Sequence, residues 1–193
     1  MENYSDHIYC YPNSSILRNK LGILEADVLE NAERKLTMLR LYELMEKPIQ
    51  GNFNLSHLCA IHRHIFQDLY DWAGELRTVD IAKGNLFCKV EYLQLECDKL
   101  FSALQNDLDH PFSEEETVKK LAYYLAELNA LHPFREGNGR TQREFIRQLS
   151  TYWGYSLSYV SITREEMLKA SQESFLCDYT SMEKLLSRGM RKK

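Results

Sequence analysis

Residues 132–143, HPFREGNGRTQR, concentrate side chains and glycines that could bind an anion and move a proton. Gly137 and Gly139 flank Asn138, and two glycines this close allow backbone turns that other residues resist. The residues that follow are typical of a helix, so several unpaired N–H groups would point outward at its start. The helix dipole adds positive potential there, and the pattern therefore predicts a phosphate site.

Charged side chains surround this predicted backbone site. Arg140 and Arg143 are three residues apart, so both emerge on one side of the first helical turn and can bind phosphate oxygens. Two arginines favour a di- or triphosphate over a single phosphate. Glu136 would repel such a ligand unless a cation lies between them, which predicts Mg²⁺. His132 could take a proton from a hydroxyl that attacks phosphorus.

Ordinary structural interpretations exist for each part of the motif. A Gly-Asn-Gly turn is a common helix C-cap, and a histidine at a helix end is usually structural. The concentration of all these groups within residues 132–143 favours a functional site. The motif is not a Walker loop, because no Gly-Lys-Ser/Thr follows a strand. A metal site at His57, His62 and His64 is not expected, because no cysteine or acidic cluster joins them.

The elements that must position this motif are mostly helices. In residues 25–46, apolar Val28, Ala32, Leu36 and Leu39 recur at helical spacing and predict a helix. Further helices are predicted over about 55–70, from about residue 91, and from the motif to about residue 152. Capping boxes predict three more helix starts, at Ser113–Glu116, Thr163–Glu166 and Thr180–Glu183.

One segment, residues 76–90 (LRTVDIAKGNLFCKV), alternates between apolar and polar residues instead. Val79 and Ile81 flank a polar residue, and Lys83-Gly84-Asn85 is suited to a turn. We therefore expect an inserted β-hairpin. A lone hairpin is only marginally stable in water, so it must pack against the helices or serve a function.

The composition is that of a single globular domain spanning residues 1–193, with about 1–12 and 189–193 expected to be flexible. The net charge of −4 gives no general reason to expect nucleic-acid binding. No apolar run approaches the roughly 20 residues that span a bilayer, and no signal peptide is recognised. Five cysteines without a CxxC pair favour reduced thiols and a cytoplasmic location.

The segment 132–143 matches the complete signature His-x-Phe-x-Asp/Glu-Gly-Asn-Gly-Arg-x-x-Arg of the Fic (Fic/Doc) family, which the chain resembles. The stretches YPNSSILRNKLGI and IHRHIFQDLYDWAGELRTVDIAKG also resemble bacterial Fic toxins of the FicT type. This resemblance implies an all-α helical bundle with the hairpin beside the active site as a flap. It also implies adenylylation, the transfer of AMP from ATP to a Ser, Thr or Tyr hydroxyl of a protein.

The resemblance implies a role for each residue of the motif. His132 would be the general base, and Glu136 would bind the Mg²⁺ that bridges the phosphates of ATP. Phosphate-binding residues would be Gly137, Asn138 and Gly139 at the α-phosphate, and Arg140 and Arg143 at the β- and γ-phosphates.

The resemblance assigns the hairpin to target binding. An edge strand can pair with an extended segment of a target protein, with residues 79–82 and the Lys83-Gly84 turn as candidates. Lys83 and Gly84 are therefore counted among the binding residues. A hairpin that merely covers the core is the alternative.

Partners are also implied by the resemblance. FicT-type relatives suggest type II topoisomerases, DNA gyrase and topoisomerase IV, as targets. The family's inhibitory pattern Ser/Thr-x-x-x-Glu-Gly/Asn has no match in the chain, which implies a separate antitoxin that inserts a glutamate toward Arg143. Transfer of UMP, phosphocholine or a phosphoryl group, and nucleotide binding without catalysis, remain alternatives. Gly139 stands where the kinase branch of the family has lysine, and this favours AMP transfer.

Overall fold

The structure, a computed structural model, describes residues 6–83 and 85–193. Within this part helices dominate and strands form only short pairs, which confirms the expected all-α class with a small hairpin. Among the described helices, none is both long and apolar enough to cross a lipid bilayer. The elements are α1 (Ala26–Glu46), α2 (Leu55–Phe66), β1 (Ala82–Lys83), β2 (Asn85–Leu86), α3 (Val90–Asp107), α4 (Glu114–Leu131), α5 (Asn138–Tyr152), β3 (Tyr155–Leu157), α6 (Arg164–Ser174), α7 (Thr180–Gly189) and β4 (Met190–Lys192).

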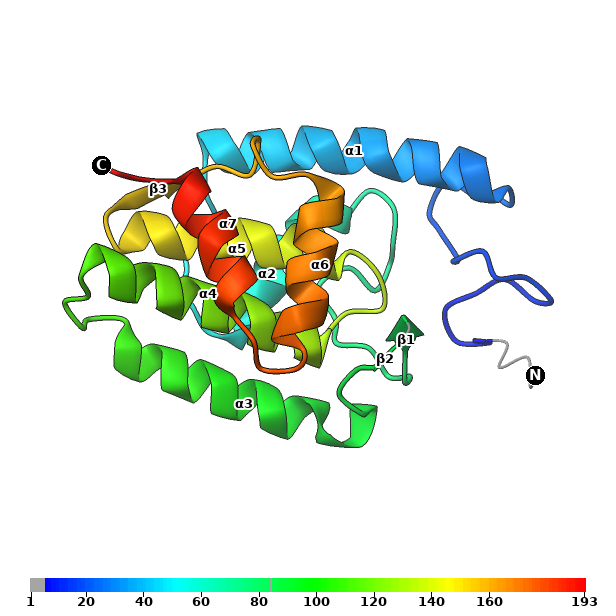
Figure 1. Cartoon of the computed structure of the whole chain (residues 1–193). Helices are drawn as coiled ribbons and strands as arrows, with labels where there is room; N and C mark the ends of the chain where they lie inside the picture. The colour runs from blue at the N-terminus through cyan, green and yellow to red at the C-terminus, as the bar shows by residue number, and fades with distance from the viewer. Residues whose placement is uncertain (1–5, 84) are drawn as a thin grey trace.

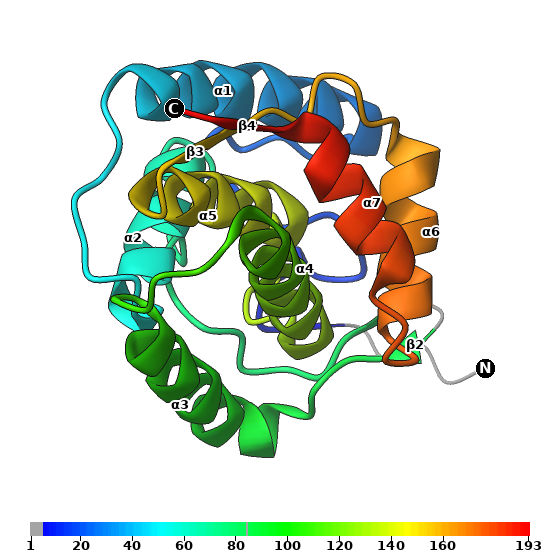
Figure 2. The same ribbon diagram turned by 60° about the vertical axis from the view of Figure 1, so that its left-hand side comes forward.

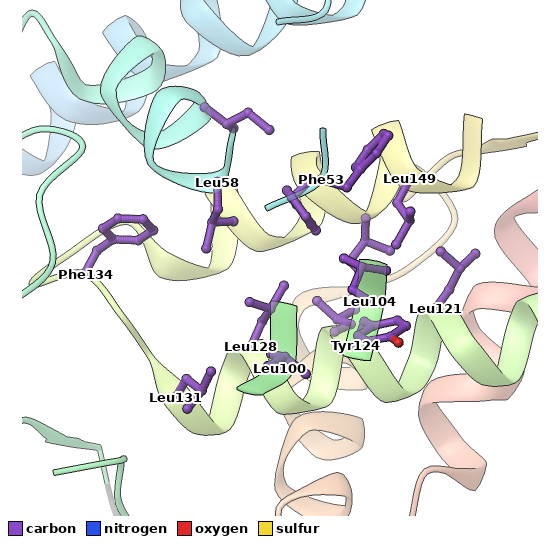
Figure 3. Packing of buried hydrophobic residues seen from close by; sticks show 14 of the residues in the cluster. Phe53, Leu58, Leu100, Leu104, Leu121, Tyr124, Leu128, Leu131, Phe134 and Leu149 are labelled. Atoms are coloured by element: carbon purple, nitrogen blue, oxygen red, sulfur yellow. The ribbon is translucent and has the colours of Figure 1, made fainter. Parts of the chain in front are cut away.

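Helices α4 and α5 lie at the centre of the molecule, with the other helices around them (Figure 2). The predicted capping box starts α4: the Glu116 N–H donates to Ser113 Oγ, and the Ser113 N–H donates to the Glu116 carboxylate. Apolar side chains from several elements, including Leu58, Leu128 and Phe134, form one core (Figure 3). Burial of this surface drives folding. The motif loop between α4 and α5 is therefore held at both ends by buried helices.

Helix α1 lies across the outside of the bundle (Figure 1) and forms where the apolar repeat predicts a helix. Of that repeat, Leu36 packs against the core, whereas Val28 and Leu39 are 47% and 52% exposed. Leu29 and Thr37 are buried. Apolar residues occur on both sides of this helix, so periodicity alone does not select the buried side. The buried Thr37 contacts Arg140 of α5, and this polar contact belongs to the inward face.

The hairpin is shorter than its sequence pattern predicts. Strands β1 and β2 have two residues each and pair antiparallel, with Ala82 opposite Leu86. Val79 and Cys88 lie outside the strands, because their carbonyl groups accept hydrogen bonds from the Arg77 guanidinium instead of pairing across the hairpin. The base of the hairpin is thus tied to the helical core through one side chain.

The described ends of the chain make specific contacts. Strand β4 pairs antiparallel with β3 and buries Met190, because an apolar side chain there completes the core. Near the other end Tyr9 and Cys10 are buried, and Cys10 forms a β-bridge with Leu17. Residues 1–5 lie outside the described part of the chain.

Candidate active site

His132 ends helix α4 and turns the chain into the motif loop. Its backbone is left-handed (φ 49°, ψ 60°), a conformation uncommon for residues other than glycine and often found at functional sites. Its N–H donates to the Leu128 carbonyl at 3.0 Å, so the turn is closed by a helical hydrogen bond. The residue is only 8% exposed and lines a cavity. The end of α4 therefore presents the imidazole to this cavity.

Two neighbours orient the imidazole of His132. Nδ1 lies 3.2 Å from the carbonyl oxygen of Asn129, which can only accept, so Nδ1 carries the proton. This tautomer leaves the ring's lone pair on Nε2, the atom that would act as a general base. The Phe87 ring stacks on the imidazole with centroids 3.8 Å apart and an interplanar angle of 14°. His132 thus has the tautomer and the restrained orientation that proton transfer requires.

The loop after His132 is anchored by Phe134 and Asn138. Phe134 is fully buried, as expected for an anchor. Asn138 Oδ1 accepts the Phe134 N–H at 2.9 Å, and Asn138 Nδ2 donates to the Phe134 carbonyl at 2.6 Å. The Asn138 side chain therefore shapes the loop, and its amide is engaged within the protein. Only its backbone, at the first position of α5, remains suited to an anion.

Gly137 is required by both its conformation and its surroundings. Its φ is 81°, and a Cβ placed there would lie 2.1 Å from Cζ of the Phe66 ring. Only glycine avoids both penalties. The loop therefore lies directly on the Phe66 ring. Helix α5 begins at the next residue, and its first N–H groups have no partner within the helix. At Gly139 the corresponding contact is Arg143 Nη1 at 3.1 Å, so this guanidinium lies along the same helix start.

Glu136 is the acidic residue of the loop. Its carboxylate accepts the Gly137 N–H at 2.8 Å and is 30% exposed. Mg²⁺ in nucleotide sites is usually bound by one or two carboxylates together with phosphate oxygens and water. One partly exposed carboxylate beside an anion-binding helix start fits that donor set. Glu136 is thus suited to a Mg²⁺ ion that binds with a nucleotide.

The two motif arginines lie in different surroundings. No hydrogen bond or ion pair joins Arg143 to another described residue, and burial lowers the pKa of its guanidinium. Arg140 instead forms an ion pair with Glu33 and donates to Thr37 Oγ1 at 3.1 Å. The sequence places both arginines at a phosphate chain; in the structure one of them is engaged by α1.

A cavity of about 520 Å³ joins the motif to α6. His132 and Arg143 line it on one side, and this volume lies in the range of small-molecule sites. Helix α6 and the residue that follows it supply an apolar wall with a few polar groups. Small-molecule sites are typically lined in this way. The wall residues are Met167, Leu168, Ser171, Gln172 and Phe175.

His62 is a buried part of the site that the sequence analysis assigned no role. Its Nδ1 accepts the Gly74 N–H at 2.8 Å, so Nε2 carries the proton and donates to the Glu136 carbonyl at 3.0 Å. The ring also stacks on Phe134 with centroids 3.9 Å apart. Burial lowers the pKa of His62 to about 4. His62 therefore supports the loop as a neutral imidazole.

This neutral histidine makes folding pH-dependent. The unfolded chain binds more protons than the folded chain between the folded-state pKa of about 4 and the ordinary value of 6.5. We expect the free energy of unfolding to fall by about 2 kcal/mol from His62 between pH 7 and pH 5. Burial also lowers the pKa of His57, which adds in the same direction. Urea unfolding at both pH values measures the free energy of unfolding. If His62→Gln lost as much stability between pH 7 and pH 5 as the wild type, His62 would not be the cause.

Arg77 links the hairpin to the end of α4. It is 2% exposed, and its guanidinium donates to the carbonyls of Leu131 and His132 at 3.2 and 2.8 Å. The same group donates to Val79 and Cys88 on the two sides of the hairpin base. The sequence analysis missed this residue; a lone arginine at the start of an alternating segment was its only signal. Arg77 therefore joins the hairpin to the backbone of His132.

The proposed binding residues of the hairpin tip cannot be placed. Gly84 and the side chain of Lys83 lie outside the part of the chain that the structure describes. The backbone of Lys83 forms β1 and pairs with Asn85 of β2. Their role in binding stays a prediction.

Comparison with known proteins shows the family to which the chain belongs. The model of the Fic/DOC family matches residues 52–150, which include His132 and the loop. The "Probable protein adenylyltransferase Fic" of Salmonella typhimurium is 38% identical over 188 residues, 94% of this chain and 91% of that protein. The "Protein adenylyltransferase VbhT" of Bartonella schoenbuchensis is 37% identical over 96% of this chain, which spans only 39% of that protein.

A solved structure has the same fold. The N-terminal Fic domain of a putative cell filamentation protein from Bartonella quintana, with bound ADP, superposes with a TM-score of 0.92. The two are 28% identical, and the match covers 97% of this chain and 96% of that one. The chain therefore belongs to the Fic/DOC family, and these relatives are named protein adenylyltransferases, which are nucleotidyltransferases.

Proposed function

We propose that this protein transfers AMP from ATP to a Ser, Thr or Tyr hydroxyl of a target protein. One observation carries the proposal: the oriented His132 and the unengaged Arg143 line the same cavity. A proton acceptor and an anion-binding cation are thereby placed around one space. The bound ADP of the Bartonella quintana structure and the names of the relatives support an adenine nucleotide as the donor.

The residues would divide the reaction between positioning and proton transfer. Arg143 and the N–H groups at the start of α5 would hold the phosphates, and the wall of α6 would hold the adenine ring. His132 Nε2 would take the proton as the target oxygen forms its bond to the α-phosphorus. The bond from that phosphorus to the bridging oxygen breaks, and pyrophosphate leaves. Mg²⁺ at Glu136 would supply positive charge to the phosphates.

The nature of the target and the regulation are also proposals. The short strands β1 and β2 present main-chain groups beside the His132 loop, which supports docking of an extended target segment there. Type II topoisomerase subunits are the candidate targets. Arg143 lines the cavity and has no hydrogen bond to another described residue, which supports a separate antitoxin that presents a glutamate carboxylate to this side chain. We place the protein in the cytoplasm as part of such a pair.

Two labels test the proposed reaction. Incubate the protein with bacterial lysate and Mg²⁺, once with ATP labelled on the α-phosphate and once with ATP labelled on the γ-phosphate. AMP transfer predicts target bands labelled from the α-phosphate alone. Label from the γ-phosphate alone would show phosphoryl transfer and overturn the proposal. No protein label from either, despite binding of ATP, would favour another donor or a binding module.

A further inference from the structure

The engagement of Arg140 by helix α1 indicates a role other than phosphate binding. Its Nη2 forms the ion pair with Glu33, and its Nη1 donates to Thr37 Oγ1 at 3.1 Å. The Thr37 hydroxyl donates its own hydrogen to the backbone carbonyl of Glu33 at 2.7 Å, so an oxygen lone pair faces Arg140. The guanidinium also lies over the Phe66 ring, 4.8 Å from its centroid. Both terminal nitrogens are thus satisfied within the protein.

The partner of Arg140 is itself held in place. Glu33 is 14% exposed, and its second carboxylate oxygen accepts the hydroxyl of Tyr70. Burial and the adjacent Glu33 carboxylate raise the pKa of Tyr70, so this hydroxyl remains a donor. Moving Arg140 to a ligand would leave a largely buried carboxylate without its cation, which is strongly unfavourable. The pair is therefore a stable contact between α1 and α5.

We propose that Arg140 is a positioning residue, clamped by Glu33 of α1, and that Arg143 alone of the two arginines binds the nucleotide phosphates. Arg140 Nη2 lies 3.7 Å from Glu136 Oε1, and the Phe66 ring beneath Arg140 also supports Gly137. The clamp therefore holds the first turn of α5 and the loop before it. A small displacement there would move the anion site relative to His132, which costs rate more than affinity.

Steady-state kinetics of AMP transfer separates the two roles. This inference rests on the proposed function, because its readouts are the kcat and the KM for ATP. We expect Glu33→Gln and Arg140→Gln each to lower kcat about tenfold and to change KM less than twofold. The kcat of the double variant should be no lower than that of the slower single variant, because the two residues act as a unit. Arg143→Gln should raise KM roughly 10- to 100-fold.

A matched control is Glu43→Gln, which removes an ion pair with Arg40 on the same helix, away from the motif. It should leave kcat and KM unchanged. If Arg140 binds phosphate and Glu33 competes for it, Glu33→Gln will lower the KM for ATP, and the inference is overturned. An unchanged kcat in Glu33→Gln also overturns it. Should Arg140→Gln fail to fold, the nearly isosteric Glu33→Gln still shows whether kcat falls or the KM for ATP falls.

Failure of the proposed function would look different. In that case wild-type protein would bind ATP without transferring AMP, or would not bind ATP at all in a calorimetric titration. A wild-type enzyme that transfers AMP, combined with a lowered KM in Glu33→Gln, contradicts only the role assigned to Arg140.

Discussion

Replacing His132 should reduce AMP transfer roughly 10²- to 10⁴-fold while ATP binding persists. The Nδ1 proton donated to Asn129 leaves Nε2 as the proton acceptor, and no substitute side chain restores that acceptor. Because residue 132 is left-handed, alanine there adds backbone strain to the loss of the base. Asparagine tolerates this conformation better. We therefore expect His132→Asn and His132→Ala to lose activity equally, with His132→Asn the more stable protein.

Two measurements decide this prediction. Initial rates of labelling from ATP carrying an α-phosphate label report the chemistry, and calorimetric titration with ATP reports binding. His110→Ala is the matched control, since His110 is exposed and lies before α4, and it should retain full activity. Retention of more than a tenth of wild-type activity in His132→Asn would show that His132 is not the base.

Arg77→Met should destabilise the protein by at least about 3–5 kcal/mol, because it leaves several buried carbonyl groups without a donor. Those of Leu131 and His132 belong to the C-terminal end of α4, where helical partners are absent. The carbonyls of Val79 and Cys88 anchor the hairpin base. Activity should fall further than stability explains, because the hairpin loses its link to His132.

Urea unfolding of the purified variant measures this loss. Arg34→Met on the outer side of α1 is the control, because Arg34 makes only one side-chain hydrogen bond, to Asn31, among the described contacts. It should stay within about 0.5 kcal/mol of wild type. A loss below about 1 kcal/mol in Arg77→Met would mean that water replaces the guanidinium at these carbonyls and that Arg77 does not anchor the hairpin.

The sequence alone determined the features that depend on neighbouring residues. The capping boxes at Ser113 and Thr163 begin α4 and α6 as predicted, because each cap spans only four residues. At Thr180 the prediction was wrong by one position: α7 starts after Tyr179, whose side chain makes no capping hydrogen bond, and the Asp178 carboxylate accepts the Thr180 N–H. The motif of residues 132–143 was equally local, so its chemistry and the family could be inferred before the fold was known.

Tertiary structure decided the features that join distant parts of the chain. Arg140 meets Glu33 across 107 positions, and His62 meets Glu136 across 74. No periodicity encodes such a pair, because a local pattern shows that a side chain is polar but not which buried partner it will satisfy. For the same reason, the apolar repeat of α1 predicts a helix but does not determine which of its sides is buried. The sequence thus predicted the groups that would do the chemistry, and the packing of α1, α2 and the hairpin around them decided which groups remain available to a ligand.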